Sequence, residues 1–172
     1  MYLECGPCTI RSWRISDEER LPLHANNRKI WLNLRDRFPH PYTRADAQRW
    51  LEQITAKESD LSFAIDVGGE AVGGIALVLG NDVERCAAEI GYWLGEQFWG
   101  RGIATAAVIA LTDYAFQNLK LTRVFAVPFA RNDPSVRVLE KAGYLREGLL
   151  RRSAIKDGVV LDQFMYAKTN DT

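Results

Sequence analysis

The sequence lacks the features that mark several large classes of protein. Its 22 basic and 22 acidic side chains cancel, so the chain has no net positive charge of the kind that attracts nucleic acid. No apolar run approaches the roughly 18 residues that span a membrane. The first residues show no basic segment followed by an apolar one, as a secretory signal would. We therefore expect a cytoplasmic protein that binds neither membranes nor nucleic acid.

Histidine and cysteine are also scarce, with two and three residues. None of them are spaced as a metal site requires, so we predict no metal. Cys5 and Cys8 have the spacing of a thioredoxin-type redox pair, but that motif precedes a helix, whereas a strand-like run, 9–13, follows here. We favour a terminal turn over the alternative, a redox protein. Cys86 opens an apolar segment, and we expect it to be a small buried core residue.

Length and composition predict one folded domain over residues 1–172, because 172 residues that are 47% hydrophobic suffice for a core. Apolar periodicity then separates strands from helices. We expect strands over 9–14, 61–67, 70–79, 86–94, 123–128, 144–156 and 159–167. We expect helices over 18–37 with a break at 26–27, and over 43–57, 100–119 and 134–142. This order predicts an α/β (α+β) fold, a mixed central sheet of about seven strands flanked by four or five helices.

The most informative segment is 89–105, where a strand ends, a loop with two glycines follows and an amphipathic helix begins. Such a turn directs backbone N–H groups and the positive end of the helix at one point, which suits phosphate or pyrophosphate. Gly100 and Gly102 would let the backbone approach the ligand closely. The alternative is a plain glycine-containing turn. The loop has neither the lysine of a P-loop nor the third glycine of a dinucleotide fingerprint, so both nucleotide interpretations are weak.

Several segments, in family order, resemble the GNAT superfamily of N-acetyltransferases and its RimJ/RimL branch. Gln97, Gly100 and Gly102, followed by Ile103 and Ala104, resemble the acyl-CoA pyrophosphate loop of that family. The other segments are 88–94, 132–135, 140–144 and 147–148, with Asp157, Gly158 and Asp162 and the early loop 38–42. The resemblance covers residues 10–168 and implies a single GNAT domain over 1–172. It also implies acetyl-CoA as co-substrate.

The resemblance implies direct attack of a primary amine on acetyl-CoA in a ternary complex. Glu89 is then the candidate general base, because a carboxylate buried among small and apolar residues has a raised pKa. The alternative for Glu89 is a salt-bridged or sheet-edge position. Ser135 is the candidate for protonating or hydrogen-bonding the departing thiolate, and its alternative is an ordinary place in a first helical turn. The tyrosine that many family members use as the acid is replaced by Leu139, which leaves the acid open between Ser135 and a water.

The resemblance places acetyl-CoA contacts at the end of the strand, along the loop and at a later helix start. These residues are Trp93, Leu94, Gln97, Trp99, Gly100, Arg101, Gly102, Ile103, Ala104, Thr105 and Asn132. The backbone of Trp93 and Leu94 would pair with the pantetheine arm, and Arg101 would meet phosphate oxygens. The alternatives are core packing for the Trp93 side chain, a solvated loop position for Arg101 and a helix-start position for Asn132.

The acceptor side is implied to include Trp31, Phe38, His40 and Tyr42, which lie in the early helices and loop. The alternative is that these four side chains pack in the core and do not contact the acceptor. The RimJ/RimL resemblance suggests a protein N-terminal α-amine as acceptor, while polyamines, aminoglycosides and other small amines stay open. A different class of function is a non-catalytic acyl-CoA sensor or interaction module. We expect a monomer or homodimer.

Overall fold

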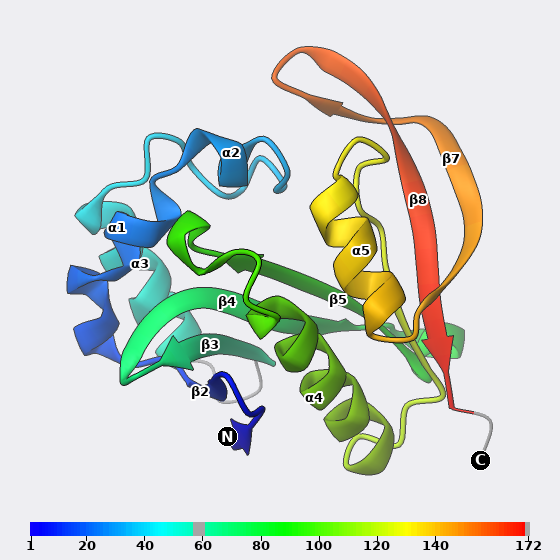
Figure 1. Cartoon of the computed structure of the whole chain (residues 1–172), viewed down its shortest axis with the longest axis horizontal. Helices are drawn as coiled ribbons and strands as arrows, with labels where there is room; N and C mark the ends of the chain where they lie inside the picture. The colour runs from blue at the N-terminus through cyan, green and yellow to red at the C-terminus, as the bar shows by residue number, and fades with distance from the viewer. Residues whose placement is uncertain (57–60, 171–172) are drawn as a thin grey trace. The chain divides into compact units, whose positions relative to one another are not determined.

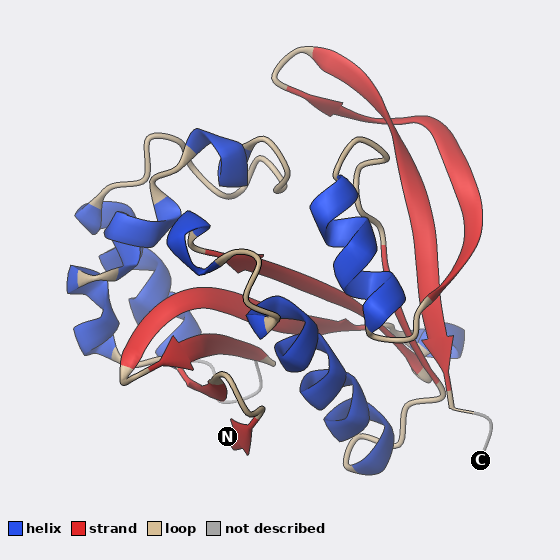
Figure 2. Cartoon of the chain, viewed as in Figure 1, coloured by secondary structure: helices blue, strands red, loops and turns tan. Residues whose placement is uncertain are grey.

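The computed structural model describes residues 1–56 and 61–170 of the chain. In these ranges eight strands form a mixed sheet with the hydrogen-bonded order β1-β2-β3-β4-β5-β6-β8-β7. The strands are β1 (Tyr2–Glu4), β2 (Thr9–Ser12), β3 (Ser62–Val67), β4 (Glu70–Leu79), β5 (Ala87–Leu94), β6 (Arg123–Ala126), β7 (Leu145–Lys156) and β8 (Val159–Thr169). The α-helices are α1 (Leu21–Ala25), α2 (Arg28–Trp31), α3 (Arg44–Thr55), α4 (Ile103–Gln117) and α5 (Asp133–Lys141) (Figures 1 and 2).

The chain divides into two units. Unit 1 comprises Met1–Ala76 and Tyr92–Ala107, and unit 2 comprises Leu77–Gly91 and Val108–Thr172. The single domain over 1–172 that we expect from the sequence stays a prediction. Strands β4 and β5 and helix α4 each contribute residues to both units.

Unit 1 is built on antiparallel strands that align apolar residues across the sheet. Leu3 lies opposite Ile10, and Ile10 lies opposite Ile65. The turn between β3 and β4 falls at Gly68 and Gly69, both with positive φ, as the sequence predicts. The core residues between this sheet and the early helices are Trp13, Leu21, Ala25, Tyr42, Ala47, Leu51, Ala64 and Ala71.

Helix α3 is capped by Thr43, the position at which the sequence predicts the helix to begin. The Thr43 hydroxyl accepts a hydrogen bond from the Asp46 N–H at 3.2 Å, and the Asp46 carboxylate accepts one from the Thr43 N–H at 2.9 Å. This reciprocal pair is a capping box, which satisfies two N–H groups at the helix start. The helix ends at Thr55, and the end at Lys57 that the sequence suggests lies outside the described residues.

A buried ion cluster joins β2 and β3 to the 3-10 helix η1 (Ile15–Glu19). The Arg11 Nε is 2.7 Å from Asp66 Oδ2, and its Nη2 is 2.8 Å from Asp17 Oδ1. Two carboxylates raise the pKa of Arg11, with the Asp17 hydrogen bond the largest cause. Because all three side chains are buried, removing one would leave an uncompensated charge.

Unit 2 contains the long hairpin formed by β7 and β8, which turns at Asp157 and Gly158 as predicted (Figure 1). Strand β6 pairs in parallel with β5 from Ala87–Arg123 to Glu89–Phe125, and antiparallel with β8. The part of α4 in this unit buries Val108, Leu111 and Ala115 completely. The predicted apolar face of α4 is therefore confirmed in this unit.

Several expectations differ from the structure. Helix α4 begins at Ile103 rather than at position 100, because Gly100 and Gly102 have φ values of +74° and +77° that no right-handed helix contains. Strand β1 adds an eighth strand, since three residues are too few to show periodicity. The prediction that Cys86 is buried is wrong: it is exposed, because β5 and its buried residues begin at Ala87.

The predicted helical segment 18–37 consists of short helices. Its break at Asn26 and Asn27 is confirmed, because α1 ends at Ala25 and α2 starts at Arg28. The Asn27 side chain accepts a hydrogen bond from the Lys29 N–H at 2.9 Å and so caps α2. Helix α2 nevertheless ends at Trp31, well before position 37.

Candidate cofactor-binding and catalytic site

The loop ahead of α4 contains two glycines with free space beside their Cα atoms. Gly100 and Gly102 both have positive φ, and a side chain added at either would meet no heavy atom within 4 Å. Backbone conformation, not crowding, therefore demands glycine here. The Gly102 carbonyl accepts the N–H of Ala106 at 3.0 Å, so Gly102 caps the helix. The N–H groups of 103–105 then point out of the helix end, where an anion is favoured.

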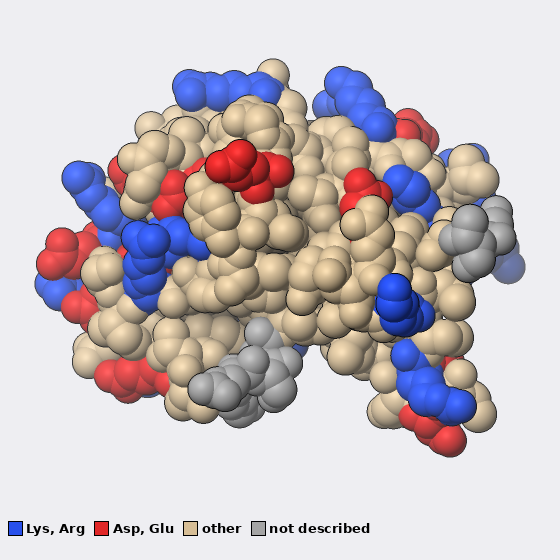
Figure 3. Space-filling view, turned by 90° about the horizontal axis from the view of Figure 1, so that it is seen from below, with Lys and Arg blue, Asp and Glu red and all other residues tan. Residues whose placement is uncertain are grey.

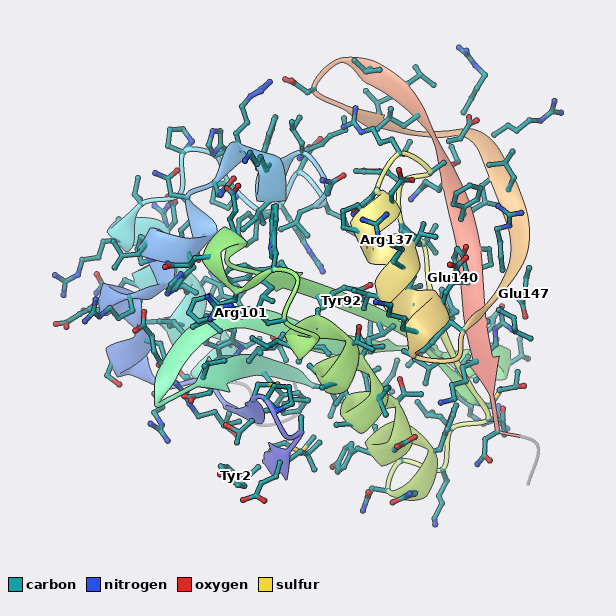
Figure 4. The ribbon with its side chains drawn as sticks, viewed as in Figure 1. Tyr2, Tyr92, Arg101, Arg137, Glu140 and Glu147 are labelled. Atoms are coloured by element: carbon teal, nitrogen blue, oxygen red, sulfur yellow. The ribbon has the colours of Figure 1, made fainter. Side chains whose placement is uncertain are left out.

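Aromatic and polar side chains fix the path between β5 and this loop. The Trp99 indole N–H donates to the Leu94 carbonyl at 2.7 Å and closes the 3-10 turn η3 (Glu96–Phe98). Arg101 is exposed, and its guanidinium carbon lies 5.4 Å from the centroid of the Phe98 ring. Figure 4 labels Arg101 on the loop between η3 and α4. Its charge is thus carried at the surface beside the two glycines.

A buried histidine, His24 of α1, contacts the same loop, and sequence reasoning missed it. Its Nε2 is 2.7 Å from Glu70 Oε1, and its Nδ1 is 3.4 Å from Gln97 Nε2. Its ring also meets Phe98 edge-to-face at 5.5 Å. A side chain at Gly95 would lie 2.9 Å from His24 Nδ1. No local spacing signals this cluster, because its members lie 46 and 73 positions from His24 along the chain.

The acidic residue of the loop is neutralised from α2. Glu96 forms an ion pair with Lys29 and accepts a hydrogen bond from the Asn27 amide at 2.7 Å. The Lys29 hydrogen bond is the main cause of the lowered pKa of Glu96. The loop therefore keeps the basic character of Arg101 although it contains a carboxylate.

The end of β5 packs against two glycines of β4. A side chain at Gly73 would lie 2.4 Å from the Trp93 carbonyl oxygen, and one at Gly74 would lie 2.7 Å from the Trp93 indole nitrogen. The Trp93 ring also contacts Phe38 at 5.6 Å between centroids. Core packing, the alternative for the Trp93 side chain, is what the structure shows.

The four residues of the expected acceptor side separate into two pairs. Phe38 and Tyr42 contact each other at 4.9 Å and belong to or pack on the core. Burial raises the pKa of Tyr42 to about 12. Trp31 and His40 instead stack at 5.5 Å, with His40 exposed. Tyr42 is therefore buried, Trp31 and Phe38 are half-buried, and His40 is the exposed member of the four.

In unit 2, Glu89 lies in the part of β5 that pairs with β6, opposite Phe125. Its neighbours Ala88 and Ile90 are buried, whereas Glu89 is half-buried. The strand thus holds this carboxylate in a rigid segment with partial access to solvent.

Asn132 and Ser135 meet at the start of α5. The Asn132 side-chain oxygen accepts the Ser135 N–H at 3.3 Å, so Asn132 caps the helix. The helix-start alternative for Asn132 is thereby present in the structure. Tyr144 is buried, bonds the Thr112 hydroxyl at 2.6 Å, and burial raises its pKa to about 12. Tyr144 is therefore part of the buried core of unit 2.

Among residues 1–56 and 61–170, no three or more His, Cys, Asp and Glu side chains gather as metal ligands would. No helix in the same ranges is both long and apolar enough to cross a membrane. Acidic and basic side chains both occur across the face drawn in Figure 3.

Comparison with known proteins agrees with this geometry. The profile of the acetyltransferase (GNAT) domain family matches residues 8–145. The putative ribosomal N-acetyltransferase YdaF of Bacillus subtilis (strain 168) is 39% identical over 169 residues, which cover 92% of this chain and 89% of YdaF. The chain therefore belongs to the GNAT acetyltransferase family and has its mixed α/β fold.

Two solved structures are similar over nearly the whole chain. RimJ of Mycobacterium smegmatis in complex with CoA-disulfide has a TM-score of 0.86 and 26% identity, covering 97% of this chain and 84% of RimJ. The microcin C7 self-immunity acetyltransferase MccE, in complex with acetyl-CoA and AMP, has a TM-score of 0.82 and 26% identity, covering 96% and 93% of the two chains. The resemblance to the RimJ/RimL branch is confirmed.

Proposed function

We propose that this protein transfers the acetyl group of acetyl-CoA to a primary amine. The observation that carries the proposal is the loop ahead of α4, whose two glycines have positive φ and open space before them. Family membership supports it, as do the CoA and acetyl-CoA held by RimJ and MccE. The N–H groups of 103–105 would receive the pyrophosphate, and Arg101 would add charge-assisted hydrogen bonds.

We assign the remaining contacts to acetyl-CoA to residues at the end of β5, in the loop that follows it and at the start of α5. We assign the pantetheine arm to backbone groups of Trp93 and Leu94, and Gln97 and Trp99 to holding the loop in shape. The Leu94 carbonyl already accepts the Trp99 indole N–H, so pairing with the arm uses other backbone groups. Asn132 contributes through its amide nitrogen, because its oxygen caps α5.

The chemistry requires a base for the amine and a donor for the leaving thiolate. Glu89 takes the proton from the acceptor ammonium, directly or through a water, and the free amine attacks the thioester carbonyl. A backbone N–H at the end of β5 polarises the carbonyl oxygen. The CoA thiolate then leaves with a hydrogen bond or proton from Ser135 or from a water. The attack is direct, in a ternary complex.

We propose a protein N-terminal α-amine as the acceptor. The name of YdaF, a putative ribosomal N-acetyltransferase, and the similarity to RimJ support this choice. The half-buried Trp31 stacks on the exposed His40 and offers an aromatic surface for a peptide. Phe38 and Tyr42 instead pack on or belong to the core. The cytoplasmic location and the monomeric or dimeric state stay predictions.

The role of Glu89 is tested by Glu89→Gln, with Glu84→Gln as a control at an exposed glutamate of the same unit. Acetyl-CoA affinity is measured by calorimetry, and turnover by CoA thiol release with N-terminal peptides and small amines. Glu89→Gln should bind acetyl-CoA normally and lose about 10²-fold or more in turnover. Glu84→Gln should match the wild type. Unchanged turnover in Glu89→Gln would remove Glu89 as the base.

A further inference from the structure

The N-terminal hairpin places two cysteines, Cys5 and Cys8, opposite each other. Residues pair across β1 and β2 from Tyr2–Arg11 to Glu4–Thr9, and the next pair in this register is Cys5 and Cys8. The Cys5 N–H donates to the Cys8 carbonyl at 2.9 Å. Opposite residues of antiparallel strands have Cα atoms about 4.5–5.5 Å apart, inside the range of about 4.4–6.8 Å that a disulfide bridges. The hairpin that carries this pair begins near Tyr2, labelled in Figure 4.

The turn that closes the hairpin sets this geometry. Gly6 has φ +81° and precedes Pro7, which matches a two-residue hairpin turn with glycine at its first central position. A strand, β2, follows Cys8 directly. The two cysteines therefore flank a hairpin turn. They do not lie at the start of a helix, as in a thioredoxin-type oxidoreductase.

The two thiols have different environments. Cys5 is half-buried, and its thiol lies 3.5 Å from the Leu3 carbonyl. Cys8 is buried, and its thiol donates to the Ile103 carbonyl at 3.9 Å. When Cys5 is a thiolate, the Cys8 S–H donates to it in place of the Ile103 carbonyl, and this hydrogen bond lowers the pKa of the Cys5 thiol. The same bond, followed by burial and the Cys5 charge, raises the pKa of Cys8. Cys5 is therefore the accessible nucleophile and Cys8 the protonated partner.

We propose that Cys5 and Cys8 are a redox modification site that low-molecular-weight disulfides, such as glutathione disulfide, convert to an intramolecular disulfide. The Cys5 thiolate attacks one sulfur of glutathione disulfide and expels one glutathione thiolate. The Cys8 sulfur, after losing its proton, then attacks Cys5 Sγ and expels the second. Both protons pass to the two glutathione thiolates, so two thiols are oxidised and one disulfide is reduced. Masking Cys5 removes the charge that holds the proton on Cys8.

A disulfide between Cys5 and Cys8 would remove a hydrogen bond to α4 within unit 1. Ile103 is the first residue of α4, directly after Gly102. A Cys8 sulfur bound to Cys5 has no S–H to donate, so the bond to the Ile103 carbonyl is lost. We expect the first turn of α4 to open more readily in the oxidised protein. This inference stands independently of the acetyl-transfer proposal, because neither step involves acetyl-CoA.

The test uses the full chain equilibrated in buffers of reduced and oxidised glutathione, followed by thiol blocking and mass spectrometry of peptides. The wild type and the matched control Cys86→Ser should both form a Cys5–Cys8 disulfide, lighter by two hydrogen atoms. Cys8→Ser should stop at a glutathione adduct on Cys5. Cys86, which is exposed and lies outside the hairpin, should carry only a glutathione adduct.

A stable glutathione adduct on Cys5 in the wild type, or a disulfide that forms only in denaturant, would overturn the proposal. Because this result concerns the wild type, it does not depend on the folding of any variant. Amide hydrogen exchange over 103–107 supplies the second readout. Oxidation should speed exchange there by about two- to tenfold, the value of one modest hydrogen bond. Unchanged exchange in a fully oxidised sample would overturn the link to α4.

Discussion

His24 and Glu70 are joined by a hydrogen bond of 2.7 Å between Nε2 and Oε1. With its proton on Nε2, the imidazole donates to Glu70 and accepts from Gln97 through Nδ1, 3.4 Å away. The side chain of His24 is only 3% exposed. The proposed pyrophosphate loop is therefore fixed by a contact between α1 and β4 that is remote from it in sequence.

Replacing His24 should weaken acetyl-CoA binding more than it slows the chemical step. His24→Ala removes a support of Gln97 but no group that meets the reacting atoms, so we expect KM for acetyl-CoA to rise about three- to tenfold with kcat nearly unchanged. Steady-state CoA release measures both. His40→Ala is the control, and it should alter KM for the amine alone. A collapse of kcat in a folded His24→Ala protein would assign His24 to the chemistry instead.

Glycine at position 102 should be required by backbone conformation. Alanine at φ +77° costs about 1–2 kcal/mol, and relief of this strain would turn the N–H groups of 103–105 away from the phosphates. We expect acetyl-CoA affinity to fall about tenfold in Gly102→Ala, measured by calorimetry. The control is Gly148→Ala in β7, where added atoms meet nothing within 4 Å and φ is not positive. Equal affinities in the two variants would contradict this role.

The sequence predicts those parts of the fold that depend on local chemistry. The Thr43 cap, the Gly68–Gly69 turn and the buried face of α4 follow from residues close together in the chain, and the structure confirms them. The contact between His24 and Gln97 depends on folding and has no local signal. The two glycines ahead of α4 can be read from the sequence. Their positive φ, because of which the helix begins only at Ile103, cannot.

The candidate site could be predicted from the sequence only as an ordered set of motifs. In the structure Gly100 and Gly102 precede α4, and Asn132 caps α5; the cofactor contacts that the motifs suggest stay a prediction. Tyr42 shows the limit of such reasoning, since an aromatic residue assigned to an acceptor wall is buried in the core. Aromatic side chains satisfy both roles equally well in sequence, and only packing distinguishes them.

Gly74→Ala should destabilise the protein by about 1–3 kcal/mol. The added methyl would lie 2.7 Å from the Trp93 indole nitrogen and 3.2 Å from the Trp13 ring, so one of the two tryptophans must move. Urea unfolding measures the loss. Gly91→Ala in β5, where nothing lies within 4 Å, should change stability by much less. If both variants unfold alike, the Trp93 packing described here is wrong.

Stability should fall in alkaline solution because of buried tyrosines. Burial raises the pKa of Tyr42 and of Tyr144 to about 12, whereas tyrosine in an unfolded chain ionises near 10. Between these values the unfolded state binds fewer protons, so the free energy of unfolding decreases as pH rises. Denaturation midpoints at about pH 9 and about pH 11 measure the fall, which should be smaller in Tyr144→Phe. An identical fall in that variant would contradict the assignment.

The most direct test of the account is calorimetric titration of the wild-type protein with acetyl-CoA, followed by CoA thiol release with N-terminal peptides and small amines. The account predicts binding in the micromolar range and CoA release that depends on the acceptor, strongest with a peptide α-amine. Binding without release on any acceptor would instead favour an acyl-CoA sensor. The absence of binding would contradict the assignment of the Gln97–Ala104 loop and the proposed activity with it.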